Sequence, residues 1–318
     1  MRLSRGMLGA DGLLLVTAMI WGFAFAAQRS GMRDMGPFAY SAARFALGTL
    51  SLLPLLALRK HRRPAFRRPL PARAAWTALA GLVLFLGVNF QQLGLVRTTA
   101  ANAGFITTLY VILVPLAGLF LGRPPGTRAW AGAGLAVAGL YVLGFQEGFT
   151  MAPGDLLELV GALFWTIHIL LINRLVTRMD ALEIAVGQVG TCSVLSLAVA
   201  LVREPAPFRG LAPAAIPVLV GGLLSIGVAY TLQIVAQKTA RPAHASIILS
   251  MEALFAGIGG VLFLREPLTG RLVGGGLLML AGMALSQSGT GPAHAGEDHD
   301  GLASSMVEAA WEPPRDQA

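Results

Sequence analysis

One acidic residue, Glu252, lies near the middle of an uncharged run that is bounded by Arg241 and Arg265. If that run spans a membrane, an ionised carboxylate costs roughly 2.5 kcal/mol or more, so it must face a cavity or a partner, or remain protonated. We therefore expect Glu252 to line a central cavity and to contact a substrate or a coupling proton. The alternative is a neutral acid that hydrogen-bonds to a neighbouring helix.

Basic and aromatic side chains in other apolar runs extend this candidate site. Arg44 lies about five residues inside its run, where the guanidinium can either reach lipid headgroups or bind an anionic group of a substrate. Trp21 and Trp165 lie about halfway along their runs rather than in the interfacial zone, which favours an aromatic cavity wall. Neutral polar groups in two further runs could hydrogen-bond a ligand or another helix: Asn89, Gln91, Gln92, Tyr230 and Gln233.

Motifs for metal, nucleotide or hydrolytic chemistry are absent from the sequence. His168 and His244 have no second ligand at metal spacing, so we predict neither a metal site nor a cofactor. The nucleotide-binding pattern GxxxxGK[ST] is also missing. An intramembrane enzyme, either a protease or a lipid-modifying transferase, is the alternative to a transport site. Against it, HExxH is missing and no histidine shares a run with Cys192 and Ser193 to activate them.

The composition excludes an ordinary soluble domain. Only 13% of the 318 residues are charged, 55% are hydrophobic and the mean hydropathy is +0.68, so too little polar surface exists to dissolve the chain. Because hydrocarbon offers the backbone no water, apolar runs of this length must be helices. We predict an all-α integral membrane protein with ten transmembrane helices, at 12–28, 40–58, 74–96, 98–122, 129–145, 156–173, 184–202, 211–237, 242–264 and 272–287.

The net charge of +8 comes from residues that lie mostly between the runs. Seven basic residues fall within 59–73, where a cytoplasmic loop facing anionic lipid is expected. This distribution predicts a multi-pass protein of the cell (inner) membrane with both termini in the cytoplasm. The basic residues are not interleaved with stacking aromatics, so nucleic acid is not an expected partner. A signal peptide cleaved near Ala24-Phe25-Ala26 is the alternative interpretation of the first run.

The two halves of the chain match each other weakly. Trp21 corresponds to Trp165, 144 positions later, and an ordered series at a spacing of 142 makes Tyr110 the counterpart of Glu252. Five helices per half is an odd number, so the second copy must enter the membrane from the opposite face, and the repeats are inverted. Chance alignment of Gly-, Ala- and Leu-rich helices is the alternative. The predicted domains are a first five-helix repeat over 1–145, a second over 146–287, and a disordered cytoplasmic tail over 288–318.

Short motifs occur in a characteristic order over about 11–287. They are Trp21-Gly22, Ala43-Arg44-Phe45, Thr99-Ala100, Gly154-Asp155, Ala245-Ser246 and Arg265-Glu266-Pro267. Together they resemble the EamA-type ten-helix carriers of the drug/metabolite transporter superfamily. The resemblance implies a secondary active transporter that exports or exchanges small metabolites or amino acids by alternating access, with a proton as a candidate coupling ion and membrane lipid around it. Ala253 stands where that family often has proline, so we expect the ninth helix to be less broken at its middle.

Overall fold

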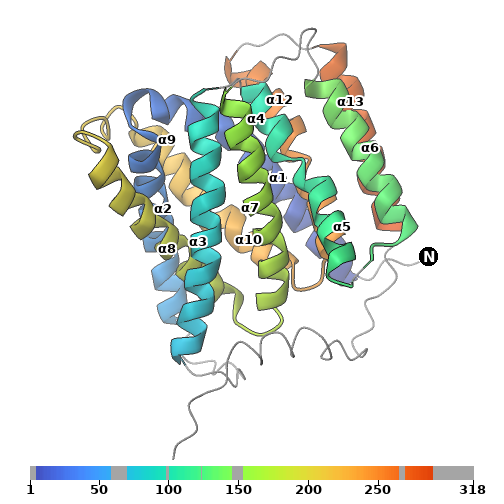
Figure 1. The fold of residues 1–318 in the computed structure, drawn as a ribbon, viewed down its shortest axis with the longest axis horizontal. Coiled ribbons are helices and arrows are strands. Elements are labelled where there is room, and N and C mark those ends of the chain that lie inside the picture. Colours follow the sequence, from blue (N-terminus) through green and yellow to red (C-terminus); the bar gives the residue numbers. More distant parts are fainter. Residues whose placement is uncertain are drawn as a thin grey trace, which may run out of the picture.

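A computed structural model of the chain describes residues 5–58, 70–97, 100–122, 124–144, 153–264 and 269–288. Within these ranges all regular structure is helical, and the helices form one bundle (Figure 1). The predicted tail, apart from Ser288, and most of the basic segment 59–73 lie outside the described residues. The helices are α1 (Arg5–Asp34), α2 (Pro37–Leu58), α3 (Leu70–Leu95), α4 (Ala100–Thr107), α5 (Tyr110–Phe120), α6 (Thr127–Gly144), α7 (Pro153–Leu175), α8 (Ala181–Arg203), α9 (Ala215–Leu219), η2 (Val220–Ala229), α10 (Tyr230–Ala236), α11 (Pro242–Leu249), α12 (Glu252–Leu264) and α13 (Gly270–Ser288).

Each predicted apolar run coincides with a helix or with a chain of shorter helices. Among the described residues, eight stretches are long and apolar enough to cross a membrane, the first at Gly9–Asp34 and the last at Pro242–Gly259. The fifth and tenth predicted runs correspond to α6 and α13, and α13 contains a shorter apolar stretch, Val273–Ser286. Among the described residues, the expected all-helical fold with several candidate membrane spans is therefore confirmed, while ten crossings remain a prediction.

Local sequence sets where several helices begin and end. Proline occupies the first position of α2, α7 and α11, where its missing N–H group would be unpaired in any helix. Asp180 caps α8 by accepting hydrogen bonds from two N–H groups of the first turn. Glu204, just after α8, accepts from the N–H groups of Phe38 and Ala39 at 2.9 Å each, so it caps the start of α2 from a distant part of the chain. The helix α1 extends past its predicted end because Arg29 terminates an apolar run without terminating a helix.

Two of the predicted spans are broken near their middles. The fourth divides into α4 and α5 at Thr108 and Leu109, and the ninth divides into α11 and α12 at Ser250 and Met251. The expectation that the ninth helix is less broken is therefore wrong. Proline is not needed, because a hydroxyl at each break bonds to the carbonyl three residues earlier, at 3.0 Å for Thr108 and 2.8 Å for Ser250. Such bonding offers the backbone an alternative to the helical ladder and bends helices.

The two breaks share one backbone hydrogen-bond pattern, 142 positions apart. The N–H groups of Leu109 and Met251 each bond to the carbonyl three residues earlier at 3.1 Å, as in a 3₁₀ turn. The N–H groups two residues further along repeat the match, at 3.0 Å in the first half and 3.1 Å in the second. Tyr110 and Glu252 directly follow the breaks, so they occupy equivalent places at the starts of α5 and α12.

The eighth predicted run is also divided, into α9, the π-helical stretch η2 and α10. A Cβ at Gly222 of η2 would lie 2.8 Å from the Cβ of Leu47, and one at Gly48 would crowd the Ile226 side chain. Glycine on both sides therefore lets α2 lie against η2 at short range. Widened π turns interrupt the regular helical ladder and are frequent at functional sites.

Glycine also lets α6 and α13 pack backbone to backbone. A Cβ at Gly132 would lie 2.6 Å from the carbonyl oxygen of Gly282, and one at Gly139 would lie 2.6 Å from that of Gly275. Neither place has room for a methyl group. Close approach of this kind is typical of membrane helices, whose association depends on van der Waals contact because lipid removes the hydrophobic driving force.

Gly132→Leu should destabilise the bundle, because the new side chain must push α6 and α13 apart. We expect a loss of about 1–3 kcal/mol, measured as a lower thermal unfolding midpoint of the purified protein in detergent. The matched control is Gly134→Leu on the same helix, where the residue is exposed and a Cβ would meet nothing within 4 Å. Equal destabilisation by the two substitutions, or by neither, would contradict the proposed packing.

Candidate functional site

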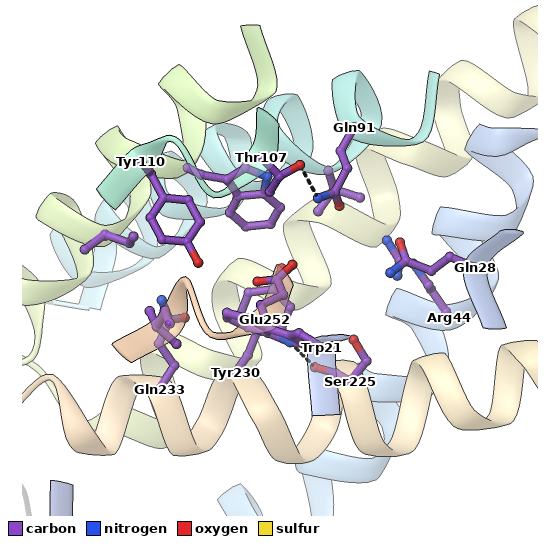
Figure 2. Close-up of a pocket in the computed structure, with 14 residues that line it drawn as sticks. Trp21, Gln28, Arg44, Gln91, Thr107, Tyr110, Ser225, Tyr230, Gln233 and Glu252 are labelled. Carbon is purple, nitrogen blue, oxygen red and sulfur yellow. Dashed lines mark hydrogen bonds between the residues drawn. The ribbon is translucent and has the colours of Figure 1, made fainter. Parts of the chain in front are cut away.

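A cavity lies inside the bundle, where the broken helices meet α1, α2, α3, α7, η2 and α10 (Figure 2). The empty space measures about 490 Å³ including its open side. Six of the eight predicted site residues line it: Trp21, Arg44, Tyr110, Trp165, Tyr230 and Glu252. The fold thus brings together side chains from both halves of the chain. That they bind a substrate remains a prediction.

Aromatic rings form one wall of the cavity. The ring centroids of Trp21 and Tyr230 lie 4.8 Å apart, and the Trp165 ring lies 6.4 Å from Tyr230 at an angle of 22°. The indole N–H of Trp21 donates to the carbonyl of Ser225 at 3.1 Å, which holds that ring against η2. The indole nitrogen of Trp165 is buried and has no partner among the described residues. The wall therefore offers flat apolar surface and one unpaired hydrogen-bond donor.

Glu252 begins α12 and is only 6% exposed. Its carboxyl group belongs to the first turn of a helix, where the helix dipole favours negative charge. Tyr110 begins α5 and points its hydroxyl into the cavity on the side of Glu252 (Figure 2). That hydroxyl is buried and lies close enough to the Glu252 carboxyl to interact with it, although no hydrogen bond of ordinary length joins the two. No ion pair of Glu252 occurs in the described part of the chain. Both groups can therefore still bond a ligand.

Arg44 is a buried cation without a counter-charge among the residues that the structure describes. It is 2% exposed, and its guanidinium carbon lies 5.3 Å from the ring centroid of Tyr40 and 5.2 Å from that of Phe45. These rings stabilise the charge only in part, and the Nε atom has no hydrogen-bond partner. Figure 2 shows Arg44 and Gln28 on the same side of the cavity. From the sequence, Arg44 is expected either to reach the lipid headgroups or to bind an anionic group of a substrate. Its burial favours the second alternative, because an anionic group in the cavity would supply the missing counter-charge.

Asn89 and Gln92 are the two predicted site residues that do not line the cavity. The Asn89 amide donates to the carbonyl of Phe85 at 2.9 Å and to the hydroxyl of Ser196 at 3.1 Å, so it joins α3 to α8. The Gln92 amide donates to the side-chain oxygen of Gln28, which joins α3 to α1. Both side chains therefore hold helices together in this conformation.

Sequence reasoning missed several neutral residues of the cavity wall, namely Gln28, Thr107 and Ser225. Gln91 and Gln233 also line it, although they were considered only as general polar groups. Helical periodicity could have found Gln28, because it follows Trp21 by seven residues and so shares a helix face with it. Thr107 and Ser225 carry no such signal, since hydroxyls in apolar helices commonly bond to their own backbone.

A polar contact ties three helices together on the amino-terminal face, which we define as the face where α1 begins. His244 at the start of α11 lies 2.9 Å from the carboxylate of Asp11 in α1 and 3.0 Å from the hydroxyl of Ser286 in α13. His168 instead lies 2.8 Å from the side-chain oxygen of Gln188, between α7 and α8. Both histidines thus make contacts between helices, and no cluster of three or more potential metal ligands occurs among the described residues.

The two candidate nucleophiles, Cys192 and Ser193, do not line the cavity. Cys192 is fully buried in an apolar cluster with Phe45 and Leu84. The hydroxyl of Ser193 donates to the carbonyl of Ala42 at 3.1 Å. Both side chains therefore help to pack α8 against the neighbouring helices.

Comparison with known proteins places this architecture in a family. The sequence profile of the "EamA-like transporter family" matches the chain twice, over residues 8–145 and 152–287. The chain belongs to the EamA-like transporter family. Membership confirms the predicted family and a membrane transporter, which implies a small-molecule substrate and a lipid environment.

Individual relatives agree with this EamA-like assignment. An "Uncharacterized transporter" of Archaeoglobus fulgidus is 32% identical over 279 residues, which cover 87% of this chain and 85% of the relative. The "Uncharacterized transporter YoaV" of Bacillus subtilis is 23% identical over 287 residues, covering 86% and 95%. A solved structure described only as "Crystal structure of protein" superposes with a TM-score of 0.71 at 21% identity, covering 87% of this chain and 96% of the other. That last likeness shows the fold alone.

Arg44→Met should raise the thermal unfolding midpoint in detergent, because it removes a buried charge that lacks a partner while keeping an apolar stem of similar length. We expect a gain of about 1–3 kcal/mol, as found when buried charges are replaced by apolar side chains. The control is Arg73→Met, since Arg73 forms an ion pair with Glu183, and its loss should leave stability unchanged or lower it by up to about 1 kcal/mol. A lower midpoint for Arg44→Met would contradict the unpaired state of this guanidinium.

Proposed function

We propose that this EamA-like protein is a secondary active transporter that exports or exchanges small zwitterionic metabolites, amino acids foremost, by alternating access. One observation carries the proposal: Arg44 and Glu252, a buried cation and a buried acid without mutual pairing, line one cavity together with an aromatic wall. Buried charges are stabilised when a ligand of opposite charge pairs with them. The cavity therefore suits a molecule that carries both signs.

Different groups of the cavity fit different parts of such a ligand. The Arg44 guanidinium presents a fork of N–H donors that fits a carboxylate. Glu252 and the hydroxyl of Tyr110 supply acceptors for an ammonium group, and Trp21 with Tyr230 supplies apolar surface for a side chain. A purely anionic ligand would leave Glu252 unpaired, and a purely cationic one would leave Arg44 unpaired.

Alternating access is supported by the matched breaks in the fourth and ninth predicted spans. Half-helices α5 and α12 begin at equivalent positions 142 residues apart, as expected for two copies of one unit. In transporters built from inverted repeats, substrates bind where discontinuous helices meet at the repeat interface, and one repeat rocks against the other. We accordingly propose inverted five-helix repeats at 1–145 and 146–287 within ten crossings.

The energy source and the orientation follow from sequence features. The chain has no nucleotide-binding motif, so a solute or proton gradient is the proposed source of energy. The seven basic residues within 59–73 support the proposed cell (inner) membrane location with both termini in the cytoplasm. Glu252 is the proposed point of contact with a coupling proton.

Glu252→Gln should abolish the effect of a proton gradient on transport, because the amide cannot carry a proton on and off. The assay is uptake of a panel of labelled zwitterionic amino acids into proteoliposomes, with and without an imposed gradient. We expect gradient-driven flux to fall about tenfold or more, a typical size for energetic coupling between sites. Glu183→Gln, the same chemical change at an acid that pairs with Arg73 outside the cavity, is the control and should retain the flux.

Gradient-driven flux that is unchanged in Glu252→Gln would remove this residue from coupling. No flux of any zwitterion by the native chain, under conditions in which it remains folded, would contradict the proposed substrate class.

A further inference from the structure

A second acid, Glu158 of α7, is buried directly behind the cavity wall. It has no exposed surface, and its Oε2 atom accepts a hydrogen bond from the hydroxyl of Thr107 at 3.0 Å. Its other oxygen, Oε1, is buried and has no partner among the described residues. A Cβ at position 94 would lie 2.6 Å from that oxygen, so Gly94 provides the space that the carboxyl group occupies.

The charged groups near Glu158 oppose its ionisation. The two charged groups that act on Glu158 are themselves acids: Asp155, one helical turn earlier on α7, and Glu252 of α12. No basic side chain in the described ranges forms an ion pair with it. A buried carboxylate in such surroundings is costly unless it binds a proton or another cation.

The helices that pack against α7 add no compensating charge close to Glu158. The side chains that they place beside it are neutral, namely Thr107 of α4 and, bonded to Thr107, Gln91 of α3. The basic side chains on or next to these neighbouring helices do not pair with Glu158. Arg73 of α3 pairs with Glu183, His244 of α11 contacts Asp11, and Arg97 is exposed beyond the end of α3.

A short hydrogen-bond chain connects this acid to the cavity. The Gln91 amide donates to the hydroxyl of Thr107 at 3.1 Å, and that hydroxyl donates to Glu158. Gln91 and Thr107 both line the cavity, and Figure 2 shows the bond between them. If Glu158 is protonated at Oε2, it can itself donate, and the hydroxyl of Thr107 must then turn its own proton elsewhere. The protonation state of Glu158 therefore changes the direction of the Thr107 hydroxyl, to which the Gln91 amide is bonded at the cavity wall.

We propose that Glu158 is a proton-binding site separate from Glu252, and that Thr107 and Gln91 transmit its protonation to the cavity. The binding of the proton is a property of the site alone. Its use in driving transport rests on the proposed function.

The proposal is tested by infrared difference spectroscopy of the full chain in liposomes, titrated in a sodium-free choline buffer over the pH range in which the protein remains folded. A buried carboxylic acid gives a carbonyl band that disappears when the proton leaves. We expect one such band to be lost in Glu158→Gln and to persist in Glu252→Gln and in Glu183→Gln. Thr107→Val, which removes the hydroxyl that bonds Oε2, should shift the frequency of the same band while leaving the acid in place.

Titration spectra that are identical in Glu158→Gln and the native chain would overturn the proposal, as would a band that Thr107→Val leaves unshifted. Because Gln retains an acceptor for Thr107, the variant should keep the native unfolding midpoint, which is checked in the same preparation. The experiment needs no substrate. A failure of zwitterion transport would therefore leave its outcome intact, and a missing band would leave the transport proposal standing with Glu252 alone.

Discussion

Hydrocarbon provides no hydrogen-bond partner, and this constraint organises the whole chain. Backbone groups bond within helices, and any interruption must be satisfied inside the bundle. At the two breaks, the hydroxyls of Thr108 and Ser250 and a pair of 3₁₀ bonds satisfy the backbone locally. The residues that follow, Tyr110 and Glu252, then face a polar cavity rather than lipid. The interruption of the helices and the position of the candidate site therefore have a common physical cause.

Polar side chains within the bundle fall into two groups. Asn89 with Ser196 and His168 with Gln188 make hydrogen bonds that join neighbouring helices. Arg44, Glu252 and Glu158 instead carry ionisable groups that form no ion pair with any described residue. Such groups lower stability, and proteins retain them where function requires them. Because these groups lie in or directly behind one cavity, their position supports the view that a bound ligand or proton pairs with them.

The sequence predicts the helices well because long apolar runs have only one stable form in a membrane, but it does not predict where they break. Neither Thr108 nor Ser250 is a helix breaker by type, and the missing proline at Ala253 suggested a straighter helix. Charged and tryptophan residues of the cavity could be predicted, since each is unusual in an apolar run. Asn89 and Gln92 could not be separated from Gln91, because neighbouring helix positions differ by about 100° and only the packing of α3 sets which one faces inward. Glu158 lies close enough to the start of its helix to be taken for an interfacial acid.

Alternating access is tested most directly by thiol labelling at two levels of the cavity. Gln28→Cys and Leu249→Cys, each in a Cys192→Ser background, report from different levels of the cavity, because Leu249 packs with Ala10 and Leu14 near the start of α1 and Gln28 lies much further along that helix. Asp11→Ala removes the contact with His244 on the amino-terminal face. With a membrane-impermeant reagent and vesicles of established orientation, Asp11→Ala should raise labelling of Leu249→Cys from the amino-terminal face and lower that of Gln28→Cys from the opposite face. Labelling that rises at both positions together, or changes at neither, would contradict a single cavity that opens to one side at a time.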